Sequence, residues 1–194
     1  MIRTEFKHRK KKCAVKSCRS EFEPRSISHR ACCPICAQQL AQDSREKADR
    51  KEIKQKLEKF KTRSEYMRDA QIAFNKYIRA RAIRFNHSCI SSGAPLPVSG
   101  TGGGFDAGHY RSIGSAPHLR FNLNNVWGQS KHDNRYGSGA AFEYRRGLIA
   151  RRGIDVVEAL ESDNKPRKFT IEYLIRIKKI FSKKASRTSK IVFI

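Results

Sequence analysis

Three residues near the middle of the chain could together carry out a hydrolysis: His109, Asn125 and Asn134. A histidine whose ring is held by a backbone carbonyl can act as the base that activates water. An asparagine carbonyl oxygen can help to bind a hard divalent cation, which stabilises a phosphate and its leaving oxygen. We therefore predict His109 as the general base, Asn134 as a ligand of Mg²⁺ or Mn²⁺, and Asn125 as the residue that fixes the loop between them. An ordinary structural role for His109 is the alternative.

The cation needs further ligands, and the flanking sequence offers Asp106 and His132. A histidine, then an asparagine on a loop, then an asparagine at the start of a helix is the order that a ββα metal site requires. The sequence therefore predicts a small hairpin followed by a helix, with the cation between them.

A second group of residues points to a structural metal. Five of the six cysteines lie between positions 13 and 36, a pattern that favours metal binding over a disulfide framework. We predict a zinc ribbon in which Cys13, Cys18, Cys33 and Cys36 bind Zn²⁺, with Cys33 chosen over Cys32 because CPIC has the tight two-residue spacing. Four thiolates leave no open position, so this zinc would hold a module together. Buried free thiols and a redox pair are the alternatives.

The elements that must position these groups are mostly helical. We predict a basic arm and zinc-ribbon module over 1–37, followed by a charged helical linker over 38–63, which contains no Gly or Pro. A helical domain around the ββα core is predicted over 64–183, and a basic tail over 184–194. Two interpretations of this linker are equally good: a solvated spacer, or a helix that contacts DNA directly.

Sequence signals place individual helices within that domain. Thr62 and Glu65 can form a capping box, and an amphipathic stripe follows them. Residues 139–153 and 154–161 are predicted as two further helices. Thr170 is predicted to cap the last one.

The net charge indicates a polyanionic partner. The chain carries 42 Lys and Arg against 18 Asp and Glu, a formal net charge of +24. Nucleic acid is the leading candidate, whereas a membrane is a weaker one because no apolar run approaches 18 residues. The basic N-terminus is not followed by the apolar region of a secretory signal. The predicted DNA contacts are the cationic residues nearest to the centre in sequence: Arg111, Arg120, Lys131, Arg135, Arg145 and Arg146.

Several motifs together resemble the NinG (Rap) family of lambdoid phage recombination proteins. They are DAGHYRS, LRFNLNN, YRRGLIARRG and FTIEYLIRIKK, and with the cysteines they cover most of the chain. The resemblance implies an HNH-like α+β fold and a metal-dependent endonuclease specific for branched DNA, such as D-loops and Holliday junctions. It also implies action in the cytoplasm of a bacterial host, with other phage recombination proteins as partners. Symmetric cutting of a junction would favour a homodimer.

One departure from that family concerns the scaffold of the site. Many relatives carry two CxxC pairs that bind a second structural zinc, but these positions here read Cys89, Ser92, Ser130 and Asp133. We therefore expect apolar packing to replace the zinc, with these side chains as candidates: Phe105, Leu119, Phe121 and Trp127. The alternative function is a catalytically inactive protein that binds DNA, and an RNA-binding zinc-ribbon protein is a weaker third.

Overall fold

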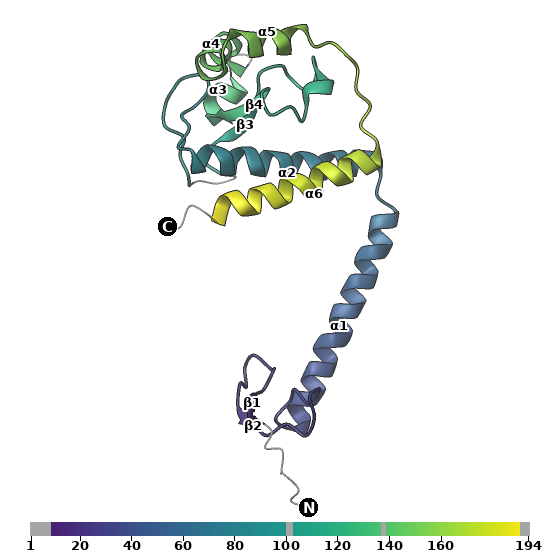
Figure 1. Cartoon of the computed structure of the whole chain (residues 1–194). Coiled ribbons are helices and arrows are strands. Elements are labelled where there is room, and N and C mark those ends of the chain that lie inside the picture. The colour runs from purple at the N-terminus through teal and green to yellow at the C-terminus, as the bar shows by residue number, and fades with distance from the viewer. Residues whose placement is uncertain (1–8, 100–102, 137–138, 191–194) are drawn as a thin grey trace, which may run out of the picture. The chain divides into compact units, whose positions relative to one another are not determined.

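The structure is a computed structural model that describes residues 9–99, 103–136 and 139–190 (Figure 1). The chain divides into two compact units, Met1–Lys61 and Thr62–Ile194. Each is described separately below.

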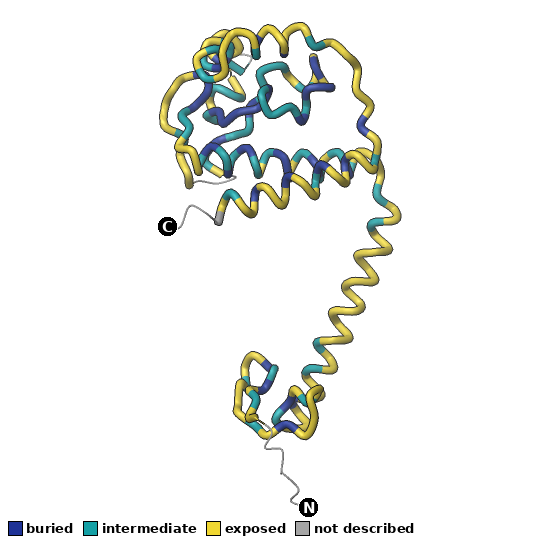
Figure 2. The backbone as a smooth tube through the Cα atoms, viewed as in Figure 1, coloured by how far each residue is buried: buried dark blue, intermediate teal, exposed yellow. Residues whose placement is uncertain are grey.

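The first unit consists of a small hairpin and one long helix. Strands β1 (Lys11–Lys12) and β2 (Glu21–Phe22) pair antiparallel, and α1 (Pro34–Lys59) follows. A proline suits the first turn of a helix, where its missing N–H costs nothing. Cys36 is the one buried residue of α1, and Figure 2 shows the helix exposed along nearly its whole length. This helix agrees with the prediction for 38–63, because mixed charges support a helix that has no core to pack against.

The second unit is built on two neighbouring helices, α2 (Arg63–Arg84) and α6 (Ile171–Lys190). The predicted capping box is present: the Thr62 hydroxyl accepts from the Glu65 N–H, and the Glu65 carboxylate accepts from the Thr62 N–H. The two helices lie side by side (Figure 1), with the Phe74 ring of α2 packed edge-on against Phe181 of α6. The core between them is apolar and almost completely buried.

A hairpin and a short helix lie on this platform. Strand β3 (Asp106–His109) pairs antiparallel with β4 (Val126–Gln129), and α3 (Lys131–Arg135) follows at once. A single 3₁₀ turn, η1 (Pro117–Leu119), interrupts the connection between the strands. The order strand, strand, helix is the predicted ββα arrangement, and the mixed α+β class is confirmed.

Two more helices cover the other side of the hairpin. These are α4 (Ala141–Arg152) and α5 (Ile154–Ser162), which meet at Gly153. Gly153 has φ of +87°, a conformation that favours glycine, so the sharp corner depends on this residue type. Tyr144 and Leu148 of α4 pack with Val157 of α5 in a second core cluster.

The structure differs from the sequence prediction at the C-terminal end. Helix α6 continues to Lys190, so most of the predicted basic tail over 184–194 is helical. The apolar end, residues 191–194, lies outside the described residues. Within the part of the chain that the structure describes, no helix has the length and apolar character needed to cross a membrane.

Candidate functional site

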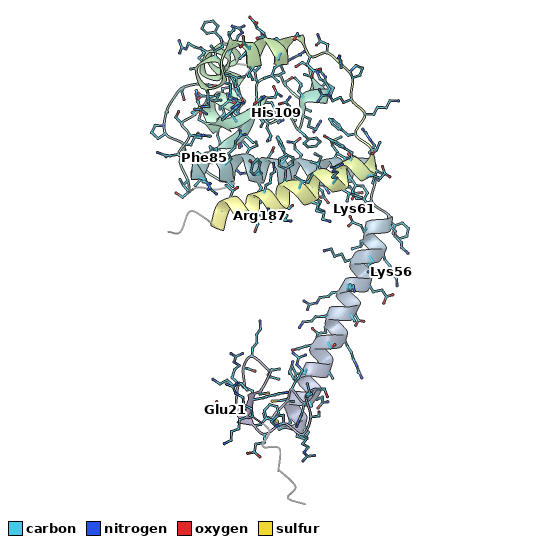
Figure 3. The ribbon with its side chains drawn as sticks, viewed as in Figure 1. Glu21, Lys56, Lys61, Phe85, His109 and Arg187 are labelled. Carbon is cyan, nitrogen blue, oxygen red and sulfur yellow. The ribbon has the colours of Figure 1, made fainter. Side chains whose placement is uncertain are left out.

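His109 stands at the end of β3, inside the second unit (Figure 3). Its Nε2 lies 3.1 Å from the backbone oxygen of Arg120, so the geometry assigns a proton to Nε2 and leaves Nδ1 as an acceptor. Burial lowers the pKa of His109, although the carbonyl contact opposes this shift. A neutral imidazole held by a backbone carbonyl is what we predicted for a general base.

Asn125 closes the loop between the two strands. Its side chain is fully buried; Oδ1 accepts from the Arg111 N–H at 2.8 Å, and Nδ2 donates to the Arg111 carbonyl at 3.0 Å. A longer contact of 3.4 Å reaches the carbonyl of Leu119, the residue before Arg120. Asn125 therefore fixes the segment whose carbonyl holds His109, as predicted for the loop asparagine. It does not line the cavity described next.

His109 opens into a cavity of about 480 Å³. Polar side chains from three elements line it: His109 from β3, Gln71 and Asn75 from α2, and Asn134 and Arg135 from α3. The structure thus brings the predicted base and the predicted cation ligand to one place.

Gln71 and Asn75 were not predicted from the sequence. The Gln71 amide donates to the Asn75 side-chain oxygen at 2.7 Å, and Arg120 Nη1 donates to Gln71 Oε1 at 3.4 Å. These two residues lie four apart on α2, beside its buried apolar stripe. Polar side chains beside the apolar stripe of α2 were the signal in the sequence that could have identified these two residues.

Asp106 contacts Asn134 but is not itself among the residues that line the His109 cavity. Asn134 Nδ2 lies 3.1 Å from Asp106 Oδ2. The two ends of an amide exchange on rotation, and adjacent ligands of an octahedral cation at 2.0–2.1 Å lie about 3 Å apart. The pair therefore fits Mg²⁺ or Mn²⁺ by spacing and by donor type. Arg135 Nε also contacts Asp106 Oδ2, at 3.3 Å, so a cation would have to displace this guanidinium.

His132, the other predicted ligand, is placed elsewhere. Its side chain is 84% exposed, its Nδ1 lies 3.4 Å from Asp133 Oδ1, and its ring packs near Tyr136. It does not line the His109 cavity. The reason is that His132 and Asn134 lie only two residues apart on α3, so their side chains point in different directions.

Two of the predicted DNA contacts are used inside the protein. Arg111 Nη1 donates to the carbonyls of Leu160 at 2.9 Å and Asp163 at 3.0 Å, so it caps the C-terminal end of α5. Arg145 forms a two-pronged ion pair with Glu161, at 2.8 and 3.2 Å. Contacts within the protein therefore hold the guanidinium groups of Arg111 and Arg145, and their contact with DNA stays a prediction.

The other predicted contacts remain near the surface. Arg135 and Arg146 are exposed, while Lys131 and Arg120 are half-buried. Burial lowers the pKa of Arg120.

The positions of the missing second zinc site are joined by hydrogen bonds. Cys89 Sγ donates to Asp133 Oδ2 at 3.1 Å and accepts from the Ser130 N–H at 3.3 Å, while the Ser130 hydroxyl accepts from the Asp133 N–H at 3.0 Å. Hydrogen bonding, first from Cys89 and also from Ser92, lowers the pKa of Asp133 to about 2. We expected packing alone to replace the metal. The predicted apolar residues are indeed buried, but this polar cluster adds a second link that the sequence analysis missed.

The four-cysteine group lies in the first unit. The sulfurs of Cys13, Cys18, Cys32 and Cys36 all lie within 4.8 Å of one another, with Cys18 and Cys32 at 3.5 Å. Four clustered thiols suit a tetrahedral zinc ion. The hydrogen bond that the Cys32 thiol shares with Cys18 is the main cause that raises the pKa of Cys32 to about 12, so zinc must displace a proton to bind here.

The structure corrects the predicted ligand Cys33. Cys33 is the exposed N-cap residue of α1, and its place in the cluster is taken by Cys32. Helix α1 begins at Pro34, so Cys32 lies just before the helix and Cys36 lies in its first turn. Cys33 is exposed beside the cluster, where its thiol still forms a hydrogen bond with Cys36.

The fold and the site thus define a mixed α+β protein. It has a cavity lined by a histidine and an asparagine, and a group of four cysteines suited to a metal. Comparison with known proteins identifies its family. Residues 5–190 match the model described as "NinG: Bacteriophage Lambda NinG protein". The chain belongs to the NinG family, which confirms the resemblance drawn from its motifs.

The relatives are similar over nearly their full length. The chain is 35% identical to "Protein ninG" of Salmonella phage P22, over 92% of this chain and 93% of the relative. It is 34% identical to "Protein ninG" of Escherichia phage lambda, over 90% and 91% respectively. No solved structure shows significant similarity to the chain.

Proposed function

We propose that this protein is a metal-dependent, structure-specific endonuclease that cuts branched DNA, such as D-loops and Holliday junctions, during phage recombination. The observation that carries the proposal is the contact between His109 Nε2 and the Arg120 carbonyl. It leaves Nδ1 of the neutral imidazole as an acceptor, and His109 and Asn134 line the same cavity. An HNH-like hydrolysis needs a base and a cation ligand in this proximity.

In the proposed mechanism, His109 Nδ1 takes a proton from the water that attacks the scissile phosphate. Asn125 keeps the imidazole oriented by fixing the loop before Arg120. Asn134 and Asp106 would hold Mg²⁺ or Mn²⁺, which when bound stabilises the negative charge on the phosphate and on the leaving oxygen. Arg135, whose guanidinium contacts Asp106, would contact a phosphate if Asp106 held the cation.

The shifted pKa of His109 has a consequence for this mechanism. Burial lowers that pKa below 6.5, so the base stays unprotonated at neutral pH. We expect cleavage to fall only when the pH drops through the lowered pKa.

The substrate class follows from charge and family. A net charge of +24 favours a polyanion, and the exposed Arg135 and Arg146 would contact phosphates, which position DNA without reading its bases. Selectivity would then come from the shape of the branch. A homodimer would allow paired cuts in a four-way junction, and other phage recombination proteins are proposed partners.

A second candidate is a protein that binds branched DNA without cutting it. The ion pair between Arg135 and Asp106 favours this reading, because a guanidinium already supplies the positive charge that the cation would bring.

Cleavage of a labelled four-way junction in Mg²⁺ or Mn²⁺ tests the proposal, with the parent chain compared with His109→Ala. We expect metal-dependent nicking near the branch point and a loss of at least about 100-fold in the variant, the contribution of a general base. His132→Ala, whose side chain lies outside the cavity, is the matched control. A loss of cleavage in that variant would restore His132 as a ligand. Junction binding with no cleavage by the parent chain would leave the second candidate.

A further inference from the structure

A second cavity, separate from the one at His109, lies between α4 and the segment over 88–93. Its volume is about 520 Å³. Arg146 and Arg151 of α4 line it on one side, and the serines of the 88–93 segment line it on the other. No carboxylate is among the described residues that line it, although Asp133 accepts hydrogen bonds from the lining residues Cys89 and Ser92. The donors that remain for a ligand are the guanidinium groups and the hydroxyls of Ser88 and Ser91.

Arg151 is held firmly at this cavity. Its Nη2 donates to the backbone oxygen of Ser88 at 3.3 Å and to the Ser88 hydroxyl at 3.2 Å, and its guanidinium lies 5.2 Å from the centre of the Trp127 ring. Nη1 is buried, and no described residue accepts a hydrogen bond from it. A buried donor without an acceptor is costly, and an anion in the cavity could supply one after a small movement of the guanidinium.

The neighbourhood of Arg151 adds further positive charge. The guanidinium of Arg81 lies 4.2 Å from the centre of the Trp127 ring, on which Arg151 also packs. Arg81 Nε and His87 Nδ1 are likewise buried without a hydrogen-bond partner among the described residues. Burial is the main cause that lowers the pKa of His87, and the positive charges of Arg151 and Arg81 lower it further.

The geometry of the cavity is fixed by close backbone contact. A Cβ atom at Gly147 would lie 1.8 Å from the backbone oxygen of Ile90, so α4 approaches the 88–93 segment as closely as glycine allows. The arginines on α4 and the serines opposite are therefore kept at a constant separation.

One buried side chain connects a lining residue of the first cavity with a lining residue of the second. Gln129 is 1% exposed, and its Nε2 donates to the Ser91 hydroxyl at 2.8 Å and to the Gly139 carbonyl at 2.7 Å. Ser91 lines the α4 cavity, and Gly139 lines the His109 cavity. One buried amide thus links the two sites, and their spacing is set by rigid structure.

We propose that the α4 cavity binds a backbone phosphate of DNA as a second phosphate subsite beside the candidate catalytic centre. This inference rests on the proposed action on branched DNA and deepens it. Phosphate oxygens accept hydrogen bonds from guanidinium and hydroxyl groups, the donors present here. Two phosphate subsites at a fixed spacing would bind one phosphate on each of two strands that diverge at a branch. A linear duplex has no diverging strands, so we expect it to bind less tightly.

The test measures binding of the zinc-loaded full chain to a four-way junction and to a linear duplex, without Mg²⁺ or Mn²⁺ so that no cleavage occurs. Arg146→Ala removes an exposed cavity charge, and Arg152→Ala removes an exposed charge on the same helix outside the lining. We expect Arg146→Ala to weaken junction binding about tenfold and to lower the salt slope by about one, with a smaller effect on the duplex. Arg152→Ala should lower the affinity for the junction and for the duplex slightly and by the same factor.

A second pair of variants distinguishes a loss of phosphate binding from a loss of folding. Ala150 is exposed and lines the cavity, so Ala150→Glu places a carboxylate there, while Ala150→Gln adds the same bulk without charge. We expect the glutamate variant to lose junction affinity and the glutamine variant to keep most of it. Equal affinities for the parent, Arg146→Ala and Ala150→Glu would overturn the subsite and leave the proposed function standing. A parent chain that binds neither DNA would overturn both.

Discussion

The hydroxyl of Tyr144 ties α4 to the hairpin that carries His109. Tyr144 is 1% exposed. Its OH donates to the backbone oxygen of Gly108 at 2.9 Å and accepts from the backbone N–H of Trp127 at 3.1 Å, and these two residues are paired across β3 and β4. We predict that Tyr144→Phe destabilises the second unit and also lowers cleavage, because Gly108 precedes His109.

The magnitude follows from the two backbone groups left behind. Removing the hydroxyl leaves one N–H and one carbonyl buried, at about 1–3 kcal/mol for each unsatisfied group. Phenylalanine fills nearly the same volume, so no large cavity term adds to this cost. We therefore expect a loss of about 2–6 kcal/mol in the free energy of unfolding of the second unit.

The assay is urea unfolding followed by near-UV circular dichroism, with zinc present so that the first unit stays constant. Tyr173→Phe is the matched control, because that side chain is 41% exposed and packs on Phe169. The control should unfold within about 0.5 kcal/mol of the parent, as surface substitutions do. The reasoning is refuted if Tyr144→Phe also stays within that margin.

Two further predictions concern the cysteines and the polar cluster. Cys32→Ser should lose stoichiometric zinc, measured by the metal content of the purified chain, whereas Cys33→Ser should retain it; the opposite result would restore Cys33 as the ligand. The depressed pKa of Asp133, about 2, means that its hydrogen bond with Cys89 contributes stability above the unfolded pKa near 4, and that this contribution is lost as the pH falls through about 2. Asp133→Asn should therefore be less stable than the parent at pH 6 but converge with it in acid, and an unchanged gap in stability between pH 6 and pH 2 would contradict this assignment.

The sequence predicted those features that depend on local chemistry. The capping box of Thr62 and Glu65 and the apolar stripe of α2 need only neighbouring residues, and both are present. The ββα order was also readable, since His109, Asn125 and Asn134 mark its parts.

The features that were missed depend on distant contacts. Arg111 caps a helix 49 residues later in the chain, and no local pattern reveals such a partner. Gln71 enters the candidate site only because α2 packs beneath β3. The choice between Cys32 and Cys33 depended on the direction of the backbone at Pro34, which spacing alone does not define.

The pairing of α2 with α6 has a consequence for synthesis of the chain. The cysteine module uses residues 13–36 and can fold soon after it leaves the ribosome. The core of the second unit cannot form then, because Phe74 of α2 packs against Phe181, which is translated 107 residues later. A nascent chain halted before residue 171 would carry a finished metal module and an exposed apolar face on α2. Any activity of the candidate site would therefore appear only after α6 has been translated.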